Sequence, residues 1–439
     1  MKSVKTFRPL AVSVAAAILA IAAACGGSGD GGQARRNLTA SDNQGQVPRS
    51  AESRRSFPTT PVPAGLPASG LGTTKEEAPA TAEERDQGST TTRQTGGQVG
   101  DHAPEFQNIA SWINSGPLTM RQLRGKVVLI DFWTYTCVNC IRTFPYLKDW
   151  YAKYAGKGLV IVGVHSPEFE FEKITENVVR SSRDFGLEYP IAQDNDFATW
   201  RAYSNRFWPA KYLVDQDGVV RYTHFGEGGY DDTEAQIRGL LEEAGADLSG
   251  VVASSETERV NDPRAFNRDP ATRLTREIYG GFSRNAAPQG IYVAHVEYYD
   301  APEQSLSYTD PGDHLNQFIY LQGPWFNGFE QLSHARETEG YEDYIALKFF
   351  ATSVNAVIDP KGGAPFEVQV TIDGRPLLPE EAGADVIVSQ GRSFFPVDEG
   401  RMYEVVALPE FTGHELKLSA NSKDFSLFAF TFGAYAGGP

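Results

Sequence analysis

Cysteine is scarce in this sequence, with three residues among 439. Cys137 and Cys140 are separated by two residues, and Cys25 lies near the N-terminus. So few cysteines exclude a small scaffold held together by several disulfides. A pair this close in sequence cannot join distant elements, so it indicates redox chemistry rather than a structural crosslink. Half of a zinc site is the alternative, but zinc takes four ligands, and the sequence offers neither a further cysteine nor a close pair of histidines.

Positive charge is also in short supply. Lysine and arginine number 40 against 56 aspartates and glutamates, which leaves a formal net charge of -16. Nucleic acid is excluded as a partner, because its phosphates require a basic protein surface. We interpret the acidic excess as solvation of the protein surface.

The first hundred residues have too few large apolar side chains to bury a core. They begin with Lys2, Lys5 and Arg8, followed at residues 10–24 by an apolar run that is too short for an ordinary membrane span. Three alanines then precede Cys25, which resembles a bacterial lipobox although alanine replaces the preferred leucine. Lipidation of Cys25 is therefore predicted, and plain cleavage or an uncleaved anchor are the alternatives.

Three of the predicted domains follow from composition. Residues 1–25 form a lipoprotein signal peptide. Residues 26–100 are Gly, Ser, Thr, Pro, Gln and charged residues without helical or strand period, so they are predicted to be a disordered linker. Residues 247–272, polar and rich in Asp, Arg and Pro, are predicted to be a second linker.

Residues 101–246 show the pattern of an α/β layer fold. Continuous apolar runs at 126–133 and 158–164 are typical of buried central strands, and an amphipathic helical pattern lies between them. Residues 211–215 and 219–223 flank an Asp-Gly turn and predict a β-hairpin. Asp231 and Glu234, three residues apart, form an N-terminal capping pattern for a last helix.

Residues 273–439 change to a period of two. Apolar and polar residues alternate over 366–372, 414–418 and 425–432, which predicts an antiparallel β-sandwich. Its aromatic side chains could stack on sugar rings or fill the core, and we favour the core. These aromatic residues include Trp325, Phe326, Tyr341 and Tyr344.

The cysteine pair follows the first strand directly and begins a helix. Disulfide exchange needs a thiolate that attacks and a second thiol close enough to resolve the mixed disulfide, and the Cys137-Val-Asn-Cys140 spacing meets both needs. Free N–H groups at a helix N-terminus stabilise negative charge on the first cysteine. Cys137 is therefore predicted to be the nucleophile and Cys140 the resolving thiol.

The segment from residue 128 to Pro145 resembles the active-site segment of thioredoxins. The resemblance implies that Asp131 is a buried acid that relays protons to Cys140, and that Pro145 kinks the active-site helix. A partly exposed carboxylate at a strand end is the alternative for Asp131. Pro209, in the Phe-Trp-Pro-Ala segment before the 211–215 strand, matches the cis-proline that holds the substrate backbone.

Longer stretches over 131–145, 163–168, 193–196 and 205–209 are similar to the extracytoplasmic part of the DipZ-type cytochrome c biogenesis proteins. This resemblance implies an α/β thioredoxin-like (TlpA-type) fold followed by an all-β sandwich of the jelly-roll or carbohydrate-binding-module type. It also implies an extracytoplasmic thiol:disulfide oxidoreductase, which the predicted lipid on Cys25 would anchor to the bacterial cell membrane. No cofactor is predicted. Its partners would be disulfide-containing exported proteins such as apocytochrome c. Because the sequence offers no run of transmembrane helices, electrons would arrive from a separate membrane donor of the CcdA type.

Two other functions stay open at this point. A thioredoxin-fold peroxidase is one, although the threonine three residues before Cys137 lacks the proline that usually precedes it in peroxiredoxins. The other is a cell-envelope glycan-binding module with secondary redox activity. His165 and Glu168 follow the second strand, where they could tune the thiolate, contact partners or merely end the strand.

Overall fold

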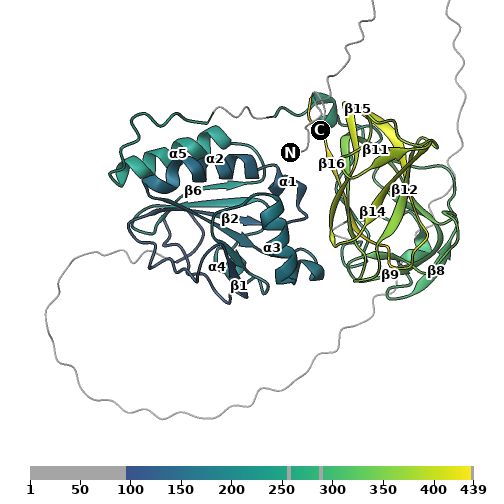
Figure 1. Ribbon diagram of the computed structural model, residues 1–439, viewed down its shortest axis with the longest axis horizontal. Helices are drawn as coiled ribbons and strands as arrows, with labels where there is room; N and C mark the ends of the chain where they lie inside the picture. The colour runs from purple at the N-terminus through teal and green to yellow at the C-terminus, as the bar shows by residue number, and fades with distance from the viewer. Residues whose placement is uncertain (1–94, 255–258, 286–289, 437–439) are drawn as a thin grey trace, which may run out of the picture. The chain divides into compact units, whose positions relative to one another are not determined.

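The computed structural model describes residues 95–254, 259–285 and 290–436. These lie in one compact unit that spans Gln87–Pro439. The unit contains two sheets, which we call the α/β region (residues 95–254) and the β region (residues 259–436) (Figure 1). The predicted fold class, thioredoxin-like α/β followed by all-β, is confirmed. The predicted domain boundaries stay predictions, and the signal peptide and first linker lie outside the described residues.

The α/β region is built on a six-stranded sheet with the order β1-β4-β3-β2-β5-β6. Strands β2, β3 and β4 run parallel to one another, while β1, β5 and β6 pair antiparallel with their neighbours. The strands are β1 Ser111–Ile113, β2 Val127–Trp133, β3 Leu159–His165, β4 Ile191–Gln193, β5 Ala210–Val214 and β6 Val220–Phe225. The helices are α1 Val138–Ile141, α2 Phe144–Tyr154, α3 Thr175–Asp184, α4 Ala198–Ala202 and α5 Tyr230–Glu243, with 3₁₀ turns η1 Ala155–Lys157 and η2 Glu170–Lys173.

Strand β2 is the centre of this sheet, and every one of its side chains is buried. Leu129 and Trp133 belong to the core that α2 and α5 cover, whereas Ile130 and Phe132 belong to the core on the other face. A strand covered on both faces needs apolar residues without alternation, which explains the run at 126–133. Asp131 is the one charged residue in this strand, and burying it needs a separate explanation.

The predicted helix after Cys137 is divided in two. Helix α1 ends at Ile141, and α2 begins at Phe144 with Pro145 in its first turn. Proline has no N–H to donate and clashes with the preceding turn, so it favours the start of a helix over its interior. The interruption separates the short cysteine-bearing turn from the longer helix that packs on the sheet.

The hairpin of β5 and β6 is confirmed, with Gly218 at φ 72° in its turn. The capping pattern at Asp231 is wrong. Helix α5 begins at Tyr230 after Gly229, whose φ of 60° suits a residue without a side chain. Glu234 instead accepts hydrogen bonds from the Tyr154 hydroxyl at 2.5 Å and from the Ser254 amide at 2.8 Å.

The β region contains one ten-stranded antiparallel sheet, with the path β13-β14-β12-β15-β11-β16-β10-β9-β8 and β7 paired to β16. The strands are β7 Ile278–Tyr279, β8 Ser305–Tyr308, β9 Ile319–Asn327, β10 Leu332–His334, β11 Tyr344–Asp359, β12 Phe366–Ile372, β13 Ile387–Ser389, β14 Arg392–Val397, β15 Arg401–Ala420 and β16 Ser426–Gly433. The 3₁₀ turns are η3 Pro263–Phe266 and η4 Val296–Tyr298.

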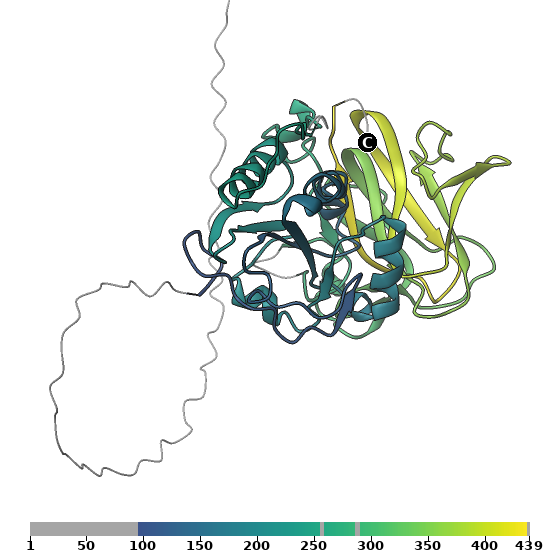
Figure 2. The same cartoon turned by 60° about the vertical axis from the view of Figure 1, so that its left-hand side comes forward.

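Two long strands hold this sheet together. Strand β11 pairs with β15 along its length, while its other edge pairs first with β9 and then with β16. Register shifts near Ser353 mark bulges, which bend the strand. The expected sandwich faces are therefore parts of one continuous sheet that curls on itself (Figures 1 and 2).

Strand β16 differs from the predicted alternation, because all eight of its residues are buried. Its Phe428 ring lies 4.8 Å from that of Phe171 and 5.1 Å from that of Phe169, both in the α/β region. The face expected to meet solvent is thus covered. Trp325 is fully buried as a core residue, whereas Phe326 is partly exposed.

Candidate active site

Cys137 and Cys140 are joined by a disulfide, with their Cα atoms 5.2 Å apart. Cys137 is the N-cap residue of α1, and its Sγ accepts a hydrogen bond from the Cys140 amide at 3.2 Å. Cys137 is partly exposed, while Cys140 is completely buried. A partner molecule can therefore reach the first sulfur but not the second.

Asp131 lies on β2, six residues before Cys137, and is completely buried. Its cross-strand neighbour on β5 is Lys211, whose Nζ is 3.4 Å from Asp131 Oδ1. Burial raises the pKa of Asp131 despite the opposing effect of the Lys211 charge. Burying a carboxylate favours its protonated form, so this group is suited to hold and release a proton inside the protein.

The space beside Asp131 is polar. Its neighbour on β3 is Gly163, where an added Cβ would lie 2.8 Å from Trp133 Nε1 and 3.1 Å from the Tyr189 ring. Burial and the Asp131 charge raise the pKa of the Tyr189 hydroxyl. Among the described residues, neither the Trp133 Nε1 nor the Tyr189 hydroxyl has a hydrogen-bond partner. Glycine thus leaves room for two polar groups beside the buried acid.

Pro209 comes to the same edge of the sheet as the cysteines. The Trp208–Pro209 peptide bond is cis. Ala210, the next residue, pairs with Phe132 near the end of β2 from which the Cys137 loop emerges. The Trp208 indole donates a hydrogen bond to the Ser166 carbonyl at 3.0 Å, which fixes this segment to the loop after β3. Strand register therefore brings Pro209 to the sheet edge that carries Cys137, although the two residues are 72 positions apart in sequence.

His165 is buried at the end of β3, and its Nε2 is 3.3 Å from Thr134 Oγ1. Burial lowers the pKa of His165 to about 3. The ring is neutral near pH 7, so it supplies no positive charge to a thiolate. In the described part of the chain, the Glu168 carboxylate contacts the β region and not the cysteines. It pairs with Arg284 at 2.9 Å and accepts a hydrogen bond from Tyr279, both in the β region.

Glu172 was not singled out by the sequence. It is completely buried in η2 and accepts a 2.6 Å hydrogen bond from the hydroxyl of Thr136, the residue before Cys137. Its other oxygen accepts a hydrogen bond from the Phe169 amide at 3.0 Å. Burial raises the pKa of Glu172 to about 7, partly opposed by the Thr136 hydrogen bond. The only sequence signal was the position of Glu172 three residues after Phe169, the residue that precedes the η2 turn. A capping-box glutamate stands at that position.

Cys25 lies outside the described residues, so its lipidation stays a prediction. Within residues 95–436, leaving out the two undescribed gaps, no helix has both the length and the apolar character needed to cross a bilayer.

Two sequence families match the chain. The family described as AhpC/TSA matches residues 99–223. The family described as thioredoxin like C-terminal domain matches residues 275–433. The two matches fall in the α/β region and the β region, respectively.

Curated relatives extend these matches. Protein DipZ of Mycobacterium bovis is 34% identical over 336 residues, which cover 75% of this chain and 43% of the relative. The chain therefore spans less than half the length of this relative. Thiol-disulfide oxidoreductase ResA of Bacillus cereus is 30% identical over 33% of this chain and 78% of its own length. YkuV of Bacillus subtilis is also named a thiol-disulfide oxidoreductase. It is 30% identical over 32% of this chain and 94% of its own length.

A solved thiol-disulfide isomerase from Corynebacterium glutamicum is 22% identical, covering 32% of this chain and 96% of that one, with a TM-score of 0.29. The ResA and YkuV matches, each at 30% identity, both cover more than two thirds of the relative. The chain belongs to the thioredoxin-like thiol-disulfide oxidoreductases.

Proposed function

We propose that this protein reduces disulfides in proteins outside the cytoplasm, and that Cys137 and Cys140 carry the electrons. The observation that supports this proposal most directly is the unequal exposure of a bonded pair, with one sulfur accessible and the other buried. A purely structural disulfide does not require an accessible sulfur at a helix N-terminus. Disulfide exchange does, because the thiolate must approach the client sulfur in line.

The reaction runs in two exchanges. The Cys137 thiolate attacks one sulfur of the client disulfide, forms a mixed disulfide and releases the other client sulfur as a thiolate. Cys140 then loses its proton and attacks the Cys137 sulfur, which releases the second client thiolate and closes the Cys137–Cys140 disulfide. The client gains two electrons and takes up two protons. An external dithiol must then reduce the protein again.

Two residues support these steps in our proposal. Asp131 accepts the Cys140 proton, because its raised pKa suits proton transfer inside the protein. Pro209 lies beside the client backbone at the edge where Cys137 emerges. Because Pro209 has no N–H, it presents no backbone donor at this edge, and the client chain can supply the donors there.

Reduction of insulin disulfides, followed by turbidity with a dithiol as reductant, tests the proposal. We expect the natural protein to accelerate precipitation and Cys137→Ser to abolish the effect. Proton transfer by a placed side chain contributes about 10²- to 10⁴-fold to rates. Asp131→Asn should therefore slow turnover by at least about tenfold while the protein keeps its fold by circular dichroism. A rate for Asp131→Asn equal to the natural one from pH 6 to 9 would remove Asp131 from the mechanism.

We further propose that a lipid on Cys25 holds the protein at the outer face of the bacterial cell membrane, and that a membrane donor of the CcdA type supplies its electrons. Apocytochrome c is the proposed client. The DipZ similarity supports this placement, and the sequence before Cys25 has the features of a lipoprotein signal. Cys25→Ser should move the protein from the membrane fraction to the soluble fraction on cell fractionation. Unchanged partitioning would contradict the anchor.

The AhpC/TSA match favours one second candidate, a thiol peroxidase. In that reaction the Cys137 thiolate would attack a peroxide oxygen, become a sulfenic acid and release water after proton uptake. Consumption of hydrogen peroxide at a rate above that of insulin reduction would favour this function. Glycan binding is not part of our proposal, because Trp325 is buried and the Tyr344 hydroxyl donates a hydrogen bond to Asp310 at 2.8 Å.

A further inference from the structure

A cleft of about 420 Å³ lies between the α/β region and the β region. Its volume is within the range of roughly 300–1,000 Å³ that is common for ligand pockets. The α/β region contributes the end of α3, and the β region contributes the start of β15. Its lining includes Tyr135, Ile141, Asp184, Phe185, Met402 and Glu404.

This cleft begins beside the disulfide. Tyr135 is two residues before Cys137, and Ile141 directly follows Cys140. On the other side of Ile141, Arg142 contacts the β region as well, with its guanidinium 4.8 Å from the centre of the Tyr435 ring. The β region therefore meets the chain near both ends of the cysteine turn. A client segment bound at Cys137 can therefore extend along the β region.

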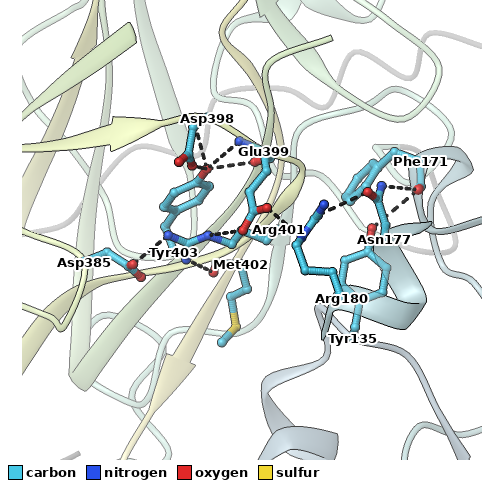
Figure 3. A network of polar contacts seen from close by, with 10 residues as sticks. All are labelled: Tyr135, Phe171, Asn177, Arg180, Asp385, Asp398, Glu399, Arg401, Met402 and Tyr403. Atoms are coloured by element: carbon cyan, nitrogen blue, oxygen red, sulfur yellow. Dashed lines mark hydrogen bonds and ion pairs between the residues drawn. The ribbon is translucent and has the colours of Figure 1, made fainter. Parts of the chain in front are cut away.

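Part of the charge in the cleft is already neutralised. Arg401 pairs with Asp385 at 2.7 Å and with Glu399 at 3.2 Å. Arg180 of α3 also pairs with Glu399, at 2.6 Å, and its own Nη2 donates to Asn177 (Figure 3). These pairs fix the two walls to each other and leave Asp385 and Glu399 compensated.

Two carboxylates in the cleft are not compensated. Asp184 ends α3 and Glu404 lies on β15, and both are exposed. Within the described residues, neither carboxylate forms an ion pair or accepts a hydrogen bond. Three partly exposed apolar side chains, Ile141, Phe185 and Met402, lie in the same cleft. Its lining thus combines an apolar floor with unpaired negative charge.

We propose that this cleft binds the client segment that adjoins the disulfide under attack, and that it selects segments with lysine or arginine beside an apolar residue. The proposal rests on the reductase function above and adds its substrate class. A basic side chain gains Coulomb energy from Asp184 and Glu404, whereas an acidic one is repelled. The apolar neighbour covers Ile141, Phe185 and Met402 and removes their surface from water.

The test uses the pre-reduced full chain and two synthetic peptides, each with one intramolecular disulfide. The peptides are identical except that Lys-Leu-Lys or Glu-Leu-Glu follows the first cysteine. The measured quantity is the second-order rate constant for oxidation of the protein by each peptide. We expect the Lys peptide to react at least tenfold faster than the Glu peptide, with the ratio approaching one at 1 M salt, where screening acts within about 3 Å.

Charge reversal in the cleft should invert this preference. In Asp184→Lys/Glu404→Lys we expect the Glu peptide to react faster than the Lys peptide, and in Asp184→Asn/Glu404→Gln we expect a ratio near one. The matched control is Glu176→Lys/Glu410→Lys, which makes the same change of net charge on the same helix and strand at exposed positions outside the cleft. The control should keep the natural ratio.

Bis(2-hydroxyethyl) disulfide, which is small and uncharged, separates the two proposals. Equal rates with this compound for all variants show that the cysteine chemistry is intact. If the ratio of the two peptide rates is then the same in Asp184→Lys/Glu404→Lys as in the control, the cleft proposal alone is overturned. No reaction of the natural protein with this compound or with either peptide would overturn the reductase function itself.

Discussion

Cys140→Ser is expected to accumulate covalent complexes with client proteins, whereas Cys137→Ser should accumulate few. Cys137 is the exposed sulfur, so it can still attack a client when Cys140 is absent. The mixed disulfide then persists, because an intramolecular thiol acts at an effective concentration of about millimolar or more and has been removed. Turnover should fall below detection in both variants.

The measurement is a non-reducing gel of cells that express each variant, with and without dithiothreitol. Bands of higher mass that vanish on reduction should mark Cys140→Ser. Mass spectrometry of these bands would identify the clients and show whether a cytochrome or a membrane reductase is among them. The double variant Cys137→Ser/Cys140→Ser is the control. Equal trapping by both single variants would contradict the assignment of Cys137 as the attacking thiol.

Glu172→Gln is expected to remove a large pH dependence of stability. The pKa of Glu172 rises from 4.5 to about 7 on folding, so the folded state binds this proton more tightly than the unfolded state. Its contribution is therefore fully favourable below pH 4.5 and is lost as the pH rises to about 7. A shift of this size corresponds to about 3 kcal/mol. Glutamine cannot ionise, so the variant should not lose this stability.

Urea unfolding of the oxidised protein at pH 5, 6, 7 and 8 provides the measurement. The difference in unfolding free energy between the variant and the natural protein should move by about 2.5 kcal/mol in favour of the variant from pH 5 to pH 8, because part of the shift already lies below pH 5. Other titrating groups cancel in this difference. Glu176→Gln, an exposed position on α3, should parallel the natural protein. Parallel curves for Glu172→Gln would show that Glu172 is ionised in both states.

Patterns within one element were predictable from the sequence. The run at 126–133 became β2 because a strand buried on both faces has to be apolar throughout. The hairpin followed from its Asp-Gly turn, whose glycine adopts a positive φ. Cys137 at the start of a helix followed from the same local reading. Each of these features depends on residues that are close in the chain.

Features that depend on register were not predictable. The Asp131–Lys211 pair exists because β5 runs antiparallel to β2 in one particular alignment, which no local pattern specifies. Glu172 meets Thr136 only after β3 returns the chain to the cysteine loop. The cap at Gly229 replaced the one expected at Asp231 because Glu234 is engaged by Tyr154, a residue of another helix. Tertiary contacts decided each of these cases.

The position of β15 in its sheet has a consequence for how the protein moves. Glu404 and Met402 of the cleft lie opposite Asn355 and Val357 of β11, among the last four pairs of that ladder. Hydrogen-bonded strand amides exchange with solvent only when the ladder opens, so deuterium uptake should be slower on this wall than at the end of α3. Asp184 and Phe185 lie instead where α3 ends, beside Gly186 with φ 66°. We therefore expect any adjustment of the proposed cleft to clients of different size at the end of α3, beyond the Arg180–Glu399 pair, while β15 keeps its position.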